Sequence, residues 1–140
     1  MTWVTFMRRF GKACRFSARQ WADLIRACIE LGRARIILYR TDPRSLVRIQ
    51  DSDLIDVTSG LVDRVAFAIP AAGGVVPWRS DCLVQALAAQ RWLAKAGIPT
   101  KLHLGVTKSD GFLAHAWLTH GTRVITGGDV SQFSSFGHLE

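Results

Sequence analysis

Residues 80–126 decide the fold, and they read SDCLVQALAAQRWLAKAGIPTKLHLGVTKSDGFLAHAWLTHGTRVIT. The first third predicts a helix over residues 81–96, because Ser80 or Asp81 is able to cap its start and Gly97-Ile98-Pro99 stops it. The rest contains three stretches rich in β-branched and aromatic residues, which predict strands. These strands are expected over residues 100–107, 112–120 and 122–126. A helix followed by an antiparallel meander indicates an α+β fold with a small sheet.

The residues before this stretch predict helices. Ser17 and Gln20 have the spacing of a capping box, and apolar side chains then recur at helical spacing to about residue 39. Asp42-Pro43 ends that helix, because a proline cannot donate the hydrogen bond that would continue it. Residues 44–69 fit one or two short helices, and the Pro and Gly content of residues 70–77 predicts a loop.

Composition favours one folded domain. With 140 residues, of which 49% are hydrophobic and 21% charged, the chain is able to bury a continuous core. No internal repeat or long linker divides it. We therefore expect a single domain over residues 1–140. Its first part, residues 1–70, is expected to be mainly helical and basic, and residues 71–140 are expected to carry the sheet.

The basic character of the chain lies in its first third. Residues 1–50 hold 11 Lys and Arg against 3 acidic residues, whereas residues 51–140 hold 7 against 8. A solvated basic face would account for this, but such a region also attracts acidic partners. No zinc-finger or RNP-like signature accompanies the charge, so nucleic acid is not the expected partner. An acidic peptide or protein is favoured.

Neither a membrane span nor a cofactor site is expected. The longest nearly uncharged stretch, residues 65–78, is shorter than a spanning helix and is interrupted by Pro and Gly. The basic residues of the N-terminus follow its apolar ones, which is the wrong order for a secretory signal and favours a cytoplasmic protein. The three cysteines, Cys14, Cys28 and Cys82, lack a CxxC pair and indicate free thiols. A zinc site of Cys82, His103 and His115 would lack the close paired spacing of metal motifs, so no metal is expected.

Cys82 is the candidate nucleophile, because it falls in the first turn of the helix predicted over residues 81–96. Unpaired backbone amides and the positive end of the helix dipole at that position both favour the thiolate over the thiol. The same amides are able to stabilise the oxyanion that forms when a thiolate attacks a carbonyl. A buried, inert thiol is the alternative for any single cysteine, and we expect it for Cys14 and Cys28.

His115 is the candidate base. Strand alternation places His115, Trp117 and Thr119 on one face of the second predicted strand. If the sheet packs against the start of the helix, the imidazole reaches Cys82. A histidine in that place is able to take the thiol proton and later give a proton to the leaving amine, which is what acyl transfer requires.

Four segments in this order carry a family resemblance: Trp78-Arg79-Ser80-Asp81-Cys82-Leu83, Gly97-Ile98-Pro99, Leu104-Gly105-Val106 and Phe112-Leu113-Ala114-His115-Ala116-Trp117-Leu118. Over residues 78 to about 129 the chain resembles the transglutaminase-like, papain-like leader peptidases of lasso-peptide biosynthesis. The resemblance implies that residues 71–140 form a transglutaminase-like catalytic core, with Cys82 as nucleophile and His115 as general base and acid. Trp78 and Trp117, which stand in the same motifs, are candidates to line the oxyanion or substrate site.

The resemblance also implies a reaction and its partners. Such hydrolases remove the leader from a ribosomally synthesised precursor through a thioester, and an ATP-dependent lasso cyclase then closes the ring. The chain is too short to include the leader-recognition domain that some relatives carry, so a separate leader-recognition protein is implied. An acyltransferase of the same fold would use the same two residues, and a non-catalytic peptide-binding adaptor would use neither, so both alternatives stay open.

The third member of the triad is where the sequence departs from the family. Relatives place an acidic residue about twelve positions after the histidine, and Gly127 occupies that place here. Asp129 is the nearest carboxylate able to orient His115, although it would equally suit a turn after two glycines. A backbone carbonyl or Thr126 is the alternative orienting group.

Overall fold

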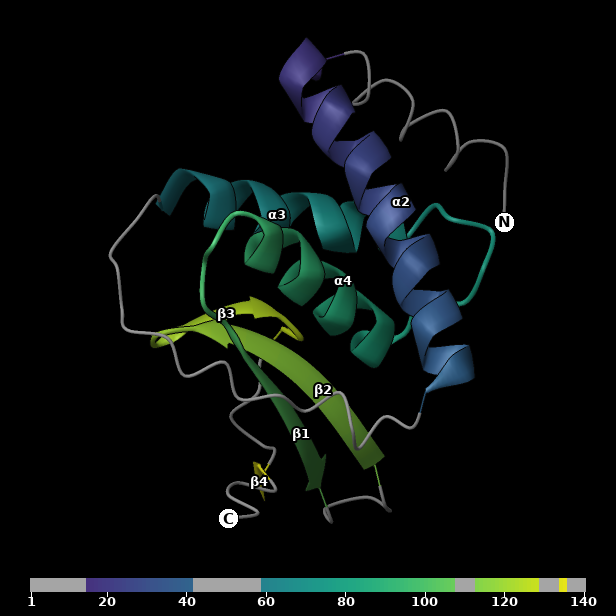
Figure 1. Ribbon diagram of the computed structural model, residues 1–140, viewed down its shortest axis with the longest axis vertical. Helices are drawn as coiled ribbons and strands as arrows, with labels where there is room; N and C mark the ends of the chain where they lie inside the picture. Colours follow the sequence, from purple (N-terminus) through teal and green to yellow (C-terminus); the bar gives the residue numbers. More distant parts are fainter. Residues whose placement is uncertain (1–14, 42–58, 108–112, 129–133, 136–140) are drawn as a thin grey trace.

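The computed structural model describes residues 15–41, 59–107, 113–128 and 134–135. In this described part of the chain, three helices gather on one side of an antiparallel sheet (Figure 1). The helices are α2 (Ala18–Arg40), α3 (Ser59–Gly73) and α4 (Cys82–Lys95). The strands are β1 (Lys101–Thr107), β2 (Leu113–His120), β3 (Arg123–Thr126) and β4 (Ser134–Ser135). This architecture confirms the predicted α+β class.

Helix α2 has the predicted start and end. The Ser17 hydroxyl accepts a hydrogen bond from the Gln20 backbone N–H, and the Gln20 side chain accepts one from the Ser17 N–H at 2.9 Å. This reciprocal pair satisfies two amide donors that the helix itself leaves unpaired. The helix ends at Arg40, where Thr41 becomes extended.

Helix α3 corrects one prediction, because residues 70–73 continue the helix where a loop was expected. Pro70 lies inside it, in its last turns. Proline removes a single hydrogen bond there, since it has no N–H to donate to the Ala66 carbonyl. Ile69 and Ala72, on either side of Pro70, are fully buried in the core. The helix continues past Pro70 because the free energy gained by burying these two side chains outweighs the loss of one hydrogen bond.

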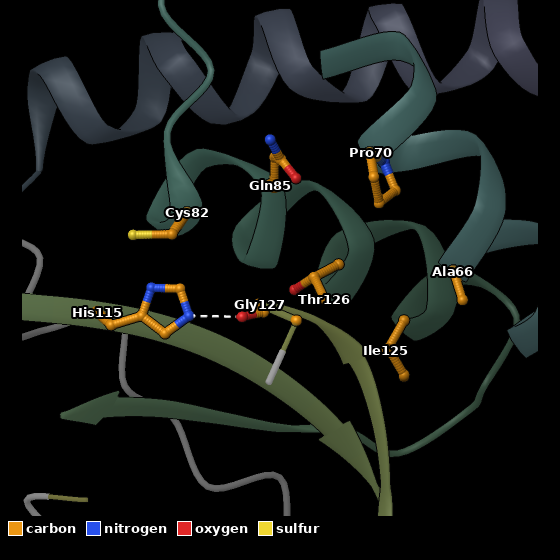
Figure 2. A pocket seen from close by; sticks show the side chains of 9 residues that line it. Ala66, Pro70, Cys82, Gln85, His115, Ile125, Thr126 and Gly127 are labelled. Atoms are coloured by element: carbon orange, nitrogen blue, oxygen red, sulfur yellow. Dashed lines mark hydrogen bonds between the residues drawn. The ribbon is translucent and has the colours of Figure 1, made fainter. Parts of the chain in front are cut away.

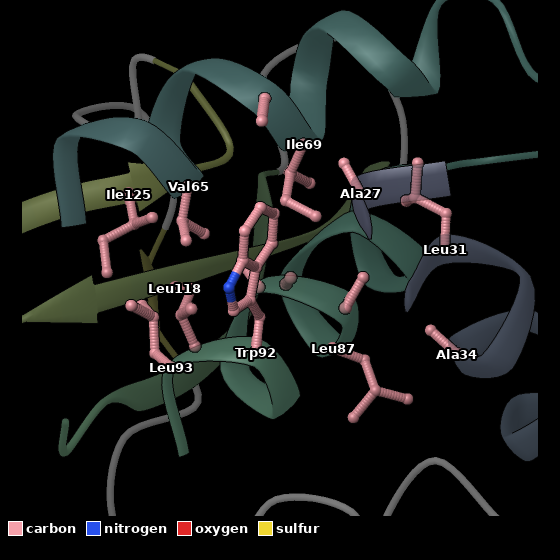
Figure 3. Packing of buried hydrophobic residues seen from close by; sticks show 14 of the residues in the cluster. Ala27, Leu31, Ala34, Val65, Ile69, Leu87, Trp92, Leu93, Leu118 and Ile125 are labelled. Atoms are coloured by element: carbon pink, nitrogen blue, oxygen red, sulfur yellow. The ribbon is translucent and has the colours of Figure 1, made fainter. Parts of the chain in front are cut away.

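Helix α4 lies at the centre of the molecule and packs against both other helices and against the sheet. Its side chains Trp92 and Leu93 are buried among residues from α2, α3, β2 and β3 (Figure 3). Asp81 caps its start by accepting a hydrogen bond from the Val84 N–H at 3.2 Å. Gly97, at φ +75°, lets the chain reverse after the last turn, as the sequence predicts.

The sheet has the strand order β3-β2-β1-β4 with antiparallel neighbours. Strands β1 and β2 pair over their length, so that Leu102 faces Leu118 and His103 faces Trp117. Leu102 and Leu118 belong to the core. The alternation of side chains therefore puts the two leucines toward the helices, while the rings of His103 and Trp117 stack on each other.

Within the described residues, ion pairs at Asp23 and Glu30 attach α2 to α3 and α4. Arg64 of α3 donates two hydrogen bonds to the Asp23 carboxylate, and these hold the pKa of Asp23 below its usual value. The stability that this pair contributes is present above the usual pKa and is lost as the pH falls through the lowered one. Lys95 of α4 donates to the buried Glu30 at 2.8 Å.

Candidate active site

An open pocket of about 500 Å³ lies where the start of α4 meets α3 and the strands β2 and β3 (Figure 2). Its walls come from segments far apart in the sequence. They are Ala66, Pro70, Cys82, Gln85, His115, Ile125, Thr126, Gly127 and Gly128. The two residues chosen from the sequence as nucleophile and base, Cys82 and His115, thus line the same pocket.

Cys82 is the first residue of α4 and lines the pocket; its side chain is half-buried, and its sulfur lies above the His115 ring and is directed away from Pro70 and Ala66 (Figure 2). The loop before it is held on both sides. The Ser80 hydroxyl donates to the Gly73 carbonyl at 3.1 Å, and the Gln85 side chain donates to the Ser80 carbonyl at 3.0 Å. The N–H groups of Cys82 and Leu83 precede the first residue that the Asp81 cap bonds, Val84. These amides at the helix start are therefore suited to bind an oxyanion.

His115 lies on β2 with its ring under the thiol of Cys82 (Figure 2). Its Nε2 is 2.7 Å from the Gly127 carbonyl oxygen. Because a carbonyl only accepts hydrogen bonds, Nε2 carries the proton and donates it. In the neutral ring Nδ1 is then the basic nitrogen, and this is the nitrogen on the side of Cys82 (Figure 2). A thiol and a basic nitrogen on facing side chains are the pair that general-base activation of a cysteine uses.

Gly127 supplies the orienting group from its backbone. Its φ is +109°, and a Cβ built on it would lie 2.4 Å from Cβ of Trp117. No other residue fits there without moving β2. A glycine at position 127 thus allows the close approach that brings its carbonyl to His115. Asp129 lies outside the residues that the structure describes, so its role stays a prediction.

Aromatic rings support His115 from behind. Trp117 is buried, and its ring centroid lies 6.1 Å from that of His115 and 5.2 Å from that of His103. Burial, with a smaller effect of Lys101, lowers the pKa of His103, whose Nε2 lies 2.9 Å from the Thr119 hydroxyl. Trp117 therefore packs beside the ring of His115 and does not itself line the pocket. Trp78, the other tryptophan predicted at the site, packs against Gly32 of α2 and is not among the residues that line the pocket.

The far end of the pocket is apolar apart from one buried hydroxyl. Ala66, Pro70 and Ile125 form its apolar walls. Within the described part of the chain, the buried Thr126 hydroxyl has no hydrogen-bond partner. The α3 residues of this wall could not be predicted from the sequence, because nothing local links Ala66 to Cys82.

The described residues contain neither a group arranged to hold a metal ion nor a helix suited to span a membrane. Among residues 15–41, 59–107, 113–128 and 134–135, no group of three or more His, Cys, Asp or Glu side chains is arranged to hold a metal ion. His120 is bonded through Nδ1 to the Pro99 carbonyl at 2.7 Å. None of the described helices has the length and apolar character needed to cross a bilayer.

Thiol alkylation is expected to separate Cys82 from Cys28. Cys28 is half-buried against the core, and burial raises the pKa of its thiol, so little thiolate is present at pH 6. Cys82 faces an open pocket beside His115. We expect iodoacetamide to modify Cys82 at pH 6 at least about tenfold faster than Cys28, as measured by peptide mass spectrometry. Equal slow rates would mean that Cys82 is not activated and would favour the adaptor. Cys14 lies outside the described residues.

One of three comparisons with known proteins finds a match. The sequence model of the transglutaminase-like superfamily matches residues 21–140. No curated protein and no solved structure matches the chain. The matched range begins inside α2 and includes every residue of the pocket.

Proposed function

Because the chain belongs to the transglutaminase-like superfamily, we propose that it is a cysteine peptidase that removes the leader from a ribosomally synthesised lasso-peptide precursor. The observation that supports a catalytic role is the common pocket of Cys82 and His115, with the far nitrogen of the imidazole bonded to Gly127. The choice of substrate rests on the motif resemblance over residues 78 to about 129.

The proposed reaction starts with proton transfer from the Cys82 thiol to His115 Nδ1. The thiolate attacks the carbonyl carbon of the last leader residue, and the amides of Cys82 and Leu83 bind the oxyanion. The imidazolium gives its proton to the departing amine as the C–N bond breaks, which leaves a thioester. Water, deprotonated by His115, then attacks the thioester and releases the leader acid and the free thiol.

The protein partners follow from the same proposal. A separate leader-recognition protein presents the precursor, and an ATP-dependent cyclase uses the amine that cleavage exposes. Cleavage takes place in the cytoplasm. The peptidase is a single domain that spans residues 1–140. An open pocket with apolar walls suits an extended peptide segment better than a small polar metabolite.

The test is product analysis after incubation of the chain with the precursor and its recognition protein in water enriched in oxygen-18. We expect two fragments whose masses together equal the precursor plus one water, with one heavy oxygen in the new carboxyl group of the leader. A crosslink or new amide without that oxygen would make the chain an acyltransferase of the same fold. An intact precursor that stays bound to the chain would make it an adaptor.

A further inference from the structure

Helix α2 has a second apolar face, which points away from the core. Its inner face is buried against α3 and α4 through Ala27, Leu31 and Ala34. The opposite face nevertheless carries large apolar side chains that are between 44% and 90% exposed. They are Trp21, Ile25, Ile29, Ile36 and Tyr39. A helix face turned to water usually carries polar residues, so this face is suited to contact with another molecule.

The spacing on this face is that of a helix–helix seam. From Ile25 to Tyr39 its positions are alternately four and three residues apart, with Gly32 in the middle. That repeat of 3.5 residues is characteristic of the a and d positions where two helices pack side by side. A lipid surface requires no such register, whereas a partner helix does.

A row of arginines borders the seam. In this repeat the d positions are Ile25, Gly32 and Tyr39. The next residues, Arg26, Arg33 and Arg40, are e positions, which pair with charges on a partner helix. The Arg26 guanidinium lies over the Trp92 ring at 5.0 Å, and Arg33 is 3.6 Å from the Glu30 carboxylate. Glu30 is also bonded to Lys95, so its one negative charge does not neutralise this edge. The edge is complementary to carboxylates.

The seam also reaches the loop that leads to Cys82. A Cβ built on Gly32 would lie 3.5 Å from Cζ2 of Trp78, so this indole covers the place in the seam where a side chain is missing. Trp78 is itself 37% exposed and stands four residues before Cys82. A helix seated on α2 would therefore touch the segment that positions the thiol.

We propose that the outer face of α2 binds an amphipathic helix of a partner protein. Aliphatic side chains of that helix pack against Ile25, Ile29, Ile36 and Trp78. Glu or Asp residues beside that seam pair with Arg26, Arg33 and Arg40. The proposal concerns a surface outside the pocket and does not require that the chain be a peptidase.

The probe is a synthetic peptide of about four heptads with Leu at both seam positions and Glu at both flanking positions. Its glutamates repel one another at neutral pH, which keeps it from pairing with itself. A matched peptide has Lys in place of every Glu. Fluorescence anisotropy with the full chain is expected to show at least about tenfold tighter binding of the Glu peptide. Equal binding of the two peptides, or no binding of either, overturns the proposal.

Variants of the full chain sharpen the test. Ile29→Asp places a charge in the seam and is expected to weaken binding of the Glu peptide at least about tenfold. Val75→Asp makes the same kind of change at a side chain that is 67% exposed and lies outside α2, and it should bind as the unaltered chain does. The double variant Arg26→Glu and Arg40→Glu is expected to prefer the Lys peptide. Circular dichroism checks that each variant is folded.

Two further measurements distinguish a partner helix on this face from a second copy of the chain or a lipid membrane. Sedimentation equilibrium of the chain alone would reveal a dimer, and co-sedimentation with phosphatidylcholine–phosphatidylglycerol vesicles would reveal membrane binding. We expect a monomer and no vesicle binding that depends on Ile29. A dimer or a vesicle complex that Ile29→Asp abolishes would assign the face to a second copy or to lipid and overturn the proposal. Loss of peptidase activity would not bear on any of these results.

Discussion

Replacement of Cys82 by alanine is expected to lower the rate of leader removal by at least about 1,000-fold, because no other group in the pocket is able to form the thioester. His115→Ala should have a loss of similar size, since the thiol then has no base and the amine no acid. The measurement is cleavage of the precursor in the presence of its recognition protein, followed by mass spectrometry.

Matched controls for these two variants lie elsewhere in the same chain. Cys28→Ala changes a half-buried thiol of α2 that the reaction does not use. His120→Ala changes a histidine of β2 that is bonded to the Pro99 carbonyl. Both should keep their rate within about threefold, and the melting curves of Cys82→Ala and His115→Ala should match that of the unaltered chain. Substantial cleavage by either site variant would contradict the proposed roles.

Gly127→Ala is expected to damage both stability and activity. The new Cβ would meet Cβ of Trp117 at 2.4 Å, and φ at +109° is itself unfavourable for alanine. We expect the free energy of unfolding to fall by about 2–4 kcal/mol, as measured by urea denaturation. Relief of the clash moves the carbonyl away from His115 Nε2, so the cleavage rate of the folded fraction should fall at least about 100-fold.

Gly121→Ala is the control for that variant. Gly121 also has a positive φ, of +56°, but nothing lies within 4 Å of a Cβ built on it, and it is in the turn between β2 and β3, outside the pocket. It should lose about 1 kcal/mol of stability and keep its rate within about threefold. If Gly127→Ala behaves like Gly121→Ala, the Gly127 carbonyl does not orient the base, and Asp129 or another group must do so.

The sequence alone predicted the elements that carry the chemistry. Ser17 with Gln20 sets the start of α2, Asp81 sets the start of α4, and Gly97 follows the end of α4. Each signal acts on residues a few positions away, so the sequence reveals it directly. The strand pattern around His115 was equally local. The prediction for residues 70–77 was partly wrong, because burial of Ile69 and Ala72 against distant helices decided how far α3 extends.

The tertiary structure decided which groups surround the thiol. The sequence named Asp129, a backbone carbonyl or Thr126 as the group that orients His115, and it could not say which carbonyl, because any residue type has one; the fold places the Gly127 carbonyl at His115 Nε2, while the role of Asp129 stays a prediction. Ala66 and Pro70 enter the pocket because α3 packs against α4 and β3. Trp78 was expected to line the active site, but tertiary packing places its ring against Gly32 of α2. Residue types and their local order determine helices, strands and the reactive pair, while the walls of the pocket depend on packing between segments that are distant in the chain.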